Sequence, residues 1–371
     1  MVRLHYLDNL RWICILLLFP VHAAVVFSAG WFGYYVTSEY TSTAALILIV
    51  STMPWLMPLL FCVAGMSTKF ALEKRSPAVY LKERVVKLLV PYLAGLILLC
   101  PVLAYVGMRA NAGYTGSFTG AFVYFFSTFN NVQDPTGFTG DFDSAHLWFI
   151  LYLFIISVAA LGVILLLKKQ TRFSLKSRTV GLPLLILLVI PVGLLNAVGD
   201  GVSGYTLASY FAMFLIGYYL FSRDSVQETL EKYRVLLAGA WILLTVGMIV
   251  FAMGIPAGTL TLLDVISSPL SPLTGWIGVL ALIGMGRHLF NGTNNFSAYL
   301  GAAAYPVYII HQPILVAVAW YVLMLAISPA VQFALIVVTS LLLTFAGYEC
   351  LKRIPVVRVL FGITSPRKKT V

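Results

Sequence analysis

The chain has 371 residues, of which 60% are hydrophobic and 10% are charged, and its mean hydropathy of +0.95 excludes a soluble globular protein. Apolar stretches long enough to cross a hydrocarbon core of ~30 Å recur from end to end, so one polytopic membrane domain, embedded in the lipid bilayer, is expected over residues 1–371. The net charge of +11 is explained by where the cations fall along the chain, and no nucleic-acid partner is expected.

Ten membrane-spanning helices are predicted from the lengths of the apolar stretches and the loops between them, which indicates an all-α membrane helix bundle. The predicted spans lie near residues 11–30, 44–71, 86–107, 146–167, 181–198, 205–222, 234–253, 273–289, 299–326 and 331–351. Of the 24 Lys and Arg residues, 23 fall on one side of this arrangement and only Arg109 on the other. By the positive-inside rule both termini, including a tail over 356–371, face the cytoplasm, and the expected location is the plasma (inner) membrane.

The first apolar segment carries two ionisable residues, Arg11 and His22, with ten residues between them. Eleven helical positions make three turns plus about 20°, so both side chains are expected on one face, about 16.5 Å apart along the axis. Asp8 can pair with Arg11, and Pro20 disturbs the turn before His22. An interface anchor at Arg11 and a simple interhelical hydrogen bond at His22 are the alternatives. Because ionisable groups are expensive inside a membrane, their alignment favours a functional site.

The segment before the third span, YLKERVVKLLVPY, presents three cations, Lys82, Arg84 and Lys87. Arg84 and Lys87 lie three residues apart, on neighbouring turns of one helix face. Such a pair can bind a phosphate-bearing cofactor by charge and hydrogen bonding. The positive-inside rule alone is the alternative explanation for these cations.

The longest extracytoplasmic loop is expected over residues 108–145, without clear secondary structure of its own. It carries Asp134, Asp141 and Asp143 and the aromatic run FVYFFSTF. Loops of this length are often functional, so this one is a candidate acceptor site or lid, with Asp141 as a candidate substrate-binding residue. An interfacial segment held by its aromatic residues is the alternative.

Two further histidines are predicted to reach the depth of His22. His146 opens the fourth span, and His311 lies about 12 residues, or roughly 18 Å, into the ninth. Three imidazoles meeting at one depth, with Tyr305 and Tyr308 on the ninth span, would suit general-base chemistry on a hydroxyl. For His146, an interfacial cap is the alternative.

The four cysteines suggest no further site. They fall in four separate apolar stretches without paired spacing, so neither a metal site nor a disulfide framework is expected.

Two other classes of function compete with catalysis. A proton-coupled transporter could use His22 and His311 as a relay, but such proteins often carry internal repeats and mid-membrane carboxylates. Here no repeat is visible, and every acidic residue maps to a loop or a span end. A non-catalytic scaffold would leave the aligned Arg11 and His22 unexplained.

Five segments, in this order along the chain, resemble the acyltransferase-3 family of integral membrane acyltransferases. They are LDNLRWICILLLFPVHA, PLLFCVAGM, KERVVKLLVPY, HLWFIL and YPVYIIHQP, and the first is the most specific signature. Within that family, YLDNLR near the start and YECLKRIPVVRVLFG near the end resemble the branch that contains glucan biosynthesis protein C, a proposed succinyltransferase acting on periplasmic glucans.

The resemblance implies transfer of an acyl group, usually acetyl, from a cytoplasmic thioester donor to a hydroxyl of a carbohydrate or envelope polymer at the outer face. Acetyl-CoA or succinyl-CoA is the implied co-substrate. His22 matches the family's catalytic histidine and Arg11 its essential arginine. The basic pair before the third span is more often two arginines in the family, whereas here Lys87 takes the second position, and a lysine cannot make a planar bidentate phosphate contact.

These implied roles predict a path across the membrane. Arg11, Arg84 and Lys87 would hold the donor phosphates at the inner face, while the pantetheine arm extends toward His22. His22 would then either remove the proton of the acceptor hydroxyl or accept the acyl group itself, and the sequence leaves both routes open.

Overall fold

Long helices are the main elements of the structure, a computed structural model that describes residues 4–28, 33–170, 180–197, 205–254, 268 and 270–363. Within these residues, eight helical segments are long and apolar enough to cross a membrane. They are α1 (His5–Val26), α2 (Thr43–Leu72), the segment Pro77–Asn111, η2 (Ala145–Leu147) joined to α7 (Trp148–Gln170), α12 (Arg234–Met253), α14 (Leu270–Leu289), α15 (Asn295–Leu323) and α16 (Pro329–Leu351). Each coincides with a predicted span, and the all-α membrane bundle is confirmed.

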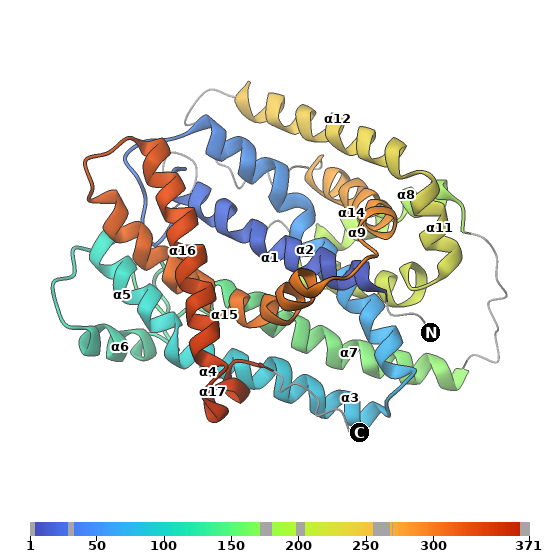
Figure 1. The fold of residues 1–371 in the computed structure, drawn as a ribbon, viewed down its shortest axis with the longest axis horizontal. Coiled ribbons are helices and arrows are strands. Elements are labelled where there is room, and N and C mark those ends of the chain that lie inside the picture. Colours follow the sequence, from blue (N-terminus) through green and yellow to red (C-terminus); the bar gives the residue numbers. More distant parts are fainter. Residues whose placement is uncertain are drawn as a thin grey trace.

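The third of these segments is built from four consecutive helical pieces. They are α3 (Pro77–Arg84), the π-helical turn η1 (Val85–Leu89), α4 (Val90–Leu98) and α5 (Cys100–Asn111), which follow one another in Figure 1. The π-helical turn lies directly after Arg84 and contains Lys87. It therefore falls within the predicted basic cluster.

Two of the ten predicted spans are shorter than expected. The span predicted at 181–198 corresponds to α8 (Leu182–Leu187) and α9 (Val189–Asn196), and the one at 205–222 to α10 (Leu207–Ile216) and η3 (Gly217–Phe221). Fifteen residues reach only about 22 Å as a helix, less than the ~30 Å hydrocarbon core. Ten full-length spans are therefore not found among the described residues. Because eight is also an even number, the predicted placement of both termini on one side is unaffected.

The expectation of a loop without clear secondary structure at 108–145 is wrong for its middle part. Residues Phe118–Ser127 form α6, and Ser117 is its N-cap. The Ser117 hydroxyl accepts a hydrogen bond from the Gly120 N–H at 3.2 Å. Ala121 and Phe125, four residues apart, are buried, whereas Val123 is exposed. The aromatic run thus has helical periodicity, and α6 packs against α5.

The predicted tail over 356–371 begins within a short helix, α17 (Pro355–Leu360). Residues 364–371 lie outside the described part of the chain. One other short helix, α11 (Asp224–Lys232), precedes α12.

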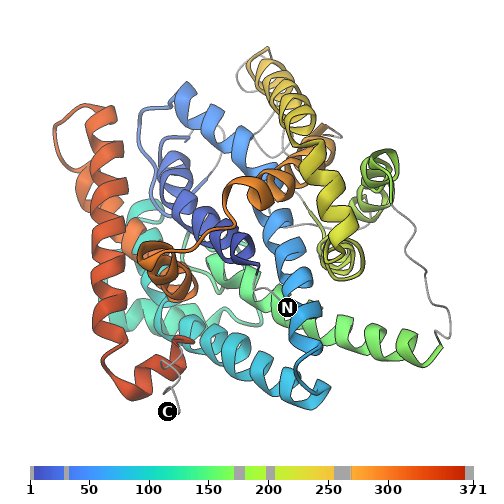
Figure 2. The ribbon, with the colours of Figure 1, turned by 45° about the vertical axis from the view of Figure 1, so that its right-hand side comes forward.

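The helices differ greatly in how much of their surface is covered by protein. In α12 and α16 only 17% and 22% of the apolar window is buried, against 61% in α1 and 78% in α2. Figures 1 and 2 show α12 and α16 at the periphery of the bundle, with α1 and α2 between them. α1 contacts α2, α14, α15 and α16. The helix that carries Arg11 and His22 is therefore central, while α12 and α16 expose apolar faces suited to lipid.

Close packing of α2 against α10 and η3 requires two glycines. A Cβ at Gly65 would lie 2.0 Å from the carbonyl oxygen of Phe214, and one at Gly217 would lie 2.1 Å from that of Cys62. Small residues allow membrane helices to approach backbone to backbone in this way.

Candidate functional site

Arg11 is held at the junction of α1 and α2. Its Nη1 lies 2.9 Å from Oδ1 of Asp8, so the predicted pair is confirmed. Its Nη2 donates a hydrogen bond to Oγ of Ser67 on α2. The guanidinium is thereby oriented by two helices and remains one-third exposed, with a side-chain exposure of 34%.

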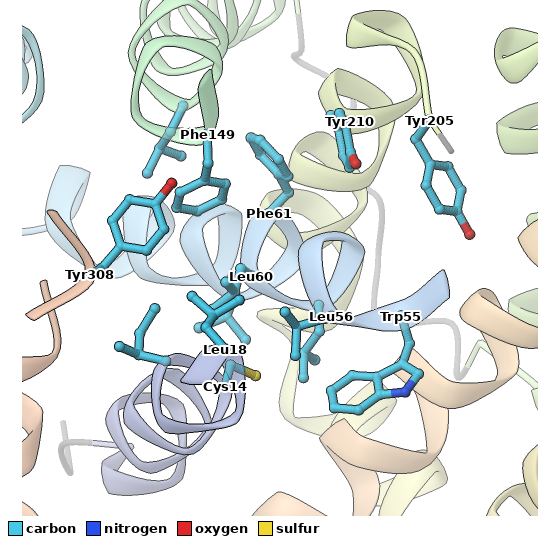
Figure 3. Packing of buried hydrophobic residues seen from close by; sticks show 14 of the residues in the cluster. Cys14, Leu18, Trp55, Leu56, Leu60, Phe61, Phe149, Tyr205, Tyr210 and Tyr308 are labelled. Atoms are coloured by element: carbon cyan, nitrogen blue, oxygen red, sulfur yellow. The ribbon is translucent and has the colours of Figure 1, made fainter. Parts of the chain in front are cut away.

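A cavity of about 650 Å³ lies beside Arg11, between α1, α2, α3, η1, α7 and α15. Its basic part, called here the cationic mouth, is lined by Arg11, Lys74, Arg75, Arg84 and Lys87. Away from the mouth the walls become apolar, with Leu60, Phe149 and Tyr308 among the lining residues. Figure 3 shows how these three side chains come together from α2, α7 and α15. The cavity therefore joins a cationic region to the aromatic core of the bundle.

Arg84 and Lys87 both line this cavity, as their spacing predicts, but they are held differently. The guanidinium of Arg84 stacks over the ring of Tyr80 at 4.5 Å, and the Tyr80 hydroxyl hydrogen-bonds Oγ1 of Thr68 at 3.0 Å. Lys87 instead pairs with Glu83 at 3.4 Å. Arg84 thus owes its position to an aromatic ring, and its Nε has no hydrogen-bond partner among the described residues.

The three histidines lie close together, beside Tyr308. Ring centroids of His22 and His311 are 5.3 Å apart, and those of His146 and His311 are 5.2 Å apart. The predicted common depth of these histidines is confirmed. His146 and His311 are buried, whereas His22 is partly exposed. The burial of His146 within this cluster does not fit the alternative of an interfacial cap.

Backbone carbonyls fix the protons on two of these imidazoles. Nδ1 of His311 lies 2.5 Å from the carbonyl oxygen of Tyr308, and Nε2 of His146 lies 2.8 Å from that of Ile309. A carbonyl oxygen only accepts, so each of these nitrogens carries the proton. Nε2 of His311 and Nδ1 of His146 are buried and have no partner in the described part of the chain. Each ring therefore presents one unused basic nitrogen.

Tyr305 and Tyr308 line the cavity together with Arg11 and Arg84. The role predicted for them, in substrate binding beside the histidines, stays a prediction. The Tyr308 hydroxyl donates to the backbone carbonyl of His146, and its ring lies 5.6 Å from that of His311. Tyr308 thus contacts both the cavity and the histidine cluster.

The sequence did not indicate Tyr34, whose ring stacks against that of His22, which also contacts His311. The two rings are nearly parallel, 6.3 Å apart and inclined by 9°, and Phe138 packs edge-on against Tyr34. Asn111 Nδ2 donates to the carbonyl oxygens of Tyr34 at 3.0 Å and of Phe138 at 2.9 Å. The segment after α1 and the segment after α6 therefore meet beside His22, through contacts that no local spacing signals.

Asp141, the predicted substrate-binding residue of this segment, is buried and accepts hydrogen bonds within it. Its carboxylate receives the Tyr124 hydroxyl at 2.8 Å and the backbone N–H of Asp134 at 2.7 Å. The substrate role stays a prediction, and the contacts give Asp141 a clear structural role. Burial raises the pKa of the neighbouring Asp143 carboxyl, although the Ala145 N–H donates to it at 2.6 Å.

Comparison with known proteins adds one finding. The family model for the acyltransferase domain of the acyltransferase-3 family matches residues 4–349, nearly the whole chain. No curated protein and no solved structure gives a significant match. The matched range contains the cavity, the cationic mouth and the three histidines, and the chain therefore belongs to the acyltransferase-3 family as a multi-pass membrane acyltransferase.

Proposed function

We propose that the protein moves an acetyl or succinyl group from a cytoplasmic acyl-CoA to a hydroxyl of an envelope carbohydrate, at the inner membrane. One observation carries this proposal: a single cavity extends from the cationic mouth to Tyr308, whose hydroxyl donates a hydrogen bond to the backbone carbonyl of His146, a member of the histidine cluster. Membership of an acyltransferase family favours this function over the transporter and the scaffold.

The cavity suits the two chemically different ends of an acyl-CoA. Arg11, Arg84 and Lys87 offer positive charge to the phosphates, and the unpartnered Nε of Arg84 offers a donor. Apolar side chains such as Ile15 and Leu60 can line a pantetheine arm. A volume of about 650 Å³ lies within the range of small-molecule pockets, ~300–1,000 Å³.

The chemistry proceeds at His22 by one of two routes. In the first, His22 takes the hydroxyl proton while the acceptor oxygen attacks the thioester carbonyl; the carbon–sulfur bond then breaks, and the CoA thiolate leaves and is protonated. In the second, a nitrogen of His22 attacks the thioester carbonyl, the carbon–sulfur bond breaks, and the CoA thiolate leaves and is protonated. The acceptor oxygen, as it loses its proton, then attacks the acyl carbon, and the carbon–nitrogen bond to His22 breaks. Both routes require that the acceptor reach His22, which is partly exposed and stacks against Tyr34.

The test is His22→Ala in cells in which this chain is the only acyltransferase for the glycan. Loss of general-base catalysis costs about 10²–10⁴-fold in rate, so O-acylation of the glycan falls below detection by intact mass spectrometry. His288→Ala is the matched control, because His288 is an exposed histidine paired with Glu231, outside the cluster. Unchanged acyl content in the His22 variant, with normal membrane levels of the protein, contradicts the proposal. A proton-coupled flux lost in the same variant would support the transporter instead.

A further inference from the structure

Two prolines inside α15, Pro306 and Pro313, each release a backbone carbonyl from the helix. A proline has no N–H, so the carbonyl four residues earlier has no helical donor. Pro306 releases the carbonyl of Ala302, and Pro313 releases that of Ile309. Of these two, the carbonyl oxygen of Ile309 receives Nε2–H of His146 at 2.8 Å.

The same turn of α15 holds the backbone of His146 as well as its ring. The Tyr308 hydroxyl donates to the His146 carbonyl oxygen, while Ile309 accepts from the ring. Ala145, directly before His146, has φ of +46°, a left-handed conformation that a residue with a Cβ rarely adopts. Such a conformation persists where surrounding contacts over-determine it. The start of η2 is therefore fixed by α15, and His146 is fixed with it.

We propose that Pro313 is a positioning residue: by freeing the Ile309 carbonyl, it anchors the His146 ring so that the bare Nδ1 stands ready to take up a proton beside Tyr308 and His311. The catalytic part of this proposal rests on the proposed function. There, one proton leaves the acceptor hydroxyl and one protonates the departing CoA thiolate. His146 Nδ1, buried and unpartnered among the described residues, can hold that proton between the two events.

The test compares Pro313→Ala with Pro306→Ala, two matched changes in the same helix. Each restores an N–H to α15 and removes a helix-disrupting ring, so both variants are expected to fold. In Pro313→Ala the new N–H also donates to the Ile309 carbonyl, in competition with Nε2–H of His146, and the anchor of His146 weakens. We expect kcat to fall about tenfold with the KM for acyl-CoA unchanged, whereas Pro306→Ala keeps the wild-type kcat.

A spectroscopic reading makes the test independent of the acyl transfer. The chain has five histidines, so ¹⁵N-histidine labelling in nanodiscs gives few signals, and a His146→Gln variant assigns the one from His146. The hydrogen-bonded Nε2–H resonance of His146 should have the same position in the wild type and in Pro306→Ala, and should move upfield, as for a weaker hydrogen bond, in Pro313→Ala. An unchanged position in Pro313→Ala overturns the anchoring, whatever the activity. A wild-type protein without acyltransferase activity would instead contradict the proposed function and leave this reading intact.

The His146→Gln variant also separates a proton-holding role from a bridging one. A glutamine amide can still donate to the Ile309 carbonyl, but it offers no basic nitrogen. We expect its thermal stability to match the wild type while its kcat falls at least as far as that of Pro313→Ala. Near-wild-type turnover in His146→Gln would overturn the proton-holding role and leave His146 as a structural bridge.

Discussion

Arg84 differs from the neighbouring cations of the cationic mouth in how its side chain is held. Lys87 and Arg75 both pair with the carboxylate of Glu83, at 3.4 and 2.7 Å. Arg84 instead lies on the face of Tyr80, which leaves its donors directed elsewhere. An aromatic ring orients a guanidinium without occupying its N–H groups. Within the cationic mouth, Arg84 is therefore the residue best prepared for a bidentate phosphate contact.

The substitution Arg84→Lys should raise the KM for acyl-CoA about tenfold with little change in kcat, because a lysine cannot make the planar bidentate contact. Steady-state kinetics with varied acyl-CoA measure this effect. Lys82→Ala is the control, since Lys82 is exposed on the same helix and does not line the cavity. Equal KM values for Arg84→Lys and the wild type would mean that the donor phosphates bind elsewhere.

At this scale, the sequence predicted those features that depend on spacing within one helix. The separation of Arg11 from His22, the pairing with Asp8 and the depth of His311 all follow from helical geometry. Tyr34 beside His22 could not be predicted, because two separate chain segments create that contact.

At the scale of elements, prolines and glycines decide how the helices meet. Pro58 in α2 releases the carbonyl of Pro54, and the Tyr205 hydroxyl donates to it at 2.9 Å. Gly65 of α2 and Gly217 of η3 bring two backbones into direct contact. The helices themselves were predictable from apolar length, but these pairings depend on which carbonyl or glycine faces which neighbour. The same limit applies to α6. Its aromatic residues are equally compatible with an interfacial segment, and its packing against α5 depends on a contact between separate helices.

The glycine contact predicts a loss of stability for Gly65→Ala. The new Cβ would lie 2.0 Å from a backbone oxygen, so α2 and α10 must separate, at a cost of about 1–3 kcal/mol. A lower Tm in detergent, by several degrees, is the expected reading. Gly247→Ala in α12 is the control, because nothing lies within 4 Å of its Cβ position and alanine favours the helix. If both variants have the Tm of the wild type, the helices do not pack through Gly65.

At the scale of the molecule, the proposed function requires the two reactants to approach the histidines from different directions. The cavity extends from the cationic mouth to Tyr308, whose hydroxyl donates to the backbone carbonyl of His146. On the other side of the cluster, Tyr34 stacks against His22 where the segments after α1 and α6 meet. His146 and His311 are buried, and the His311 ring lies beside those of Tyr308 and His22. The proposed transfer of an acyl group across the membrane therefore requires that the cationic mouth and the region beside His22 open on opposite sides of the membrane.

That condition predicts opposite labelling of two cysteines at the ends of one span. Ala78 in α3 and Ala112 after α5 are both exposed, and the segment Pro77–Asn111 between them is about 50 Å long as a helix. In a Cys350→Ala background, where the remaining three cysteines are buried, Ala112→Cys should react with a membrane-impermeant maleimide on spheroplasts and Ala78→Cys should not. Inverted vesicles should reverse the result, and detergent should expose both. Labelling of Ala78→Cys from outside would show that the orientation is the reverse of the predicted one. The cationic mouth would then lie on the side where cytoplasmic acyl-CoA is absent.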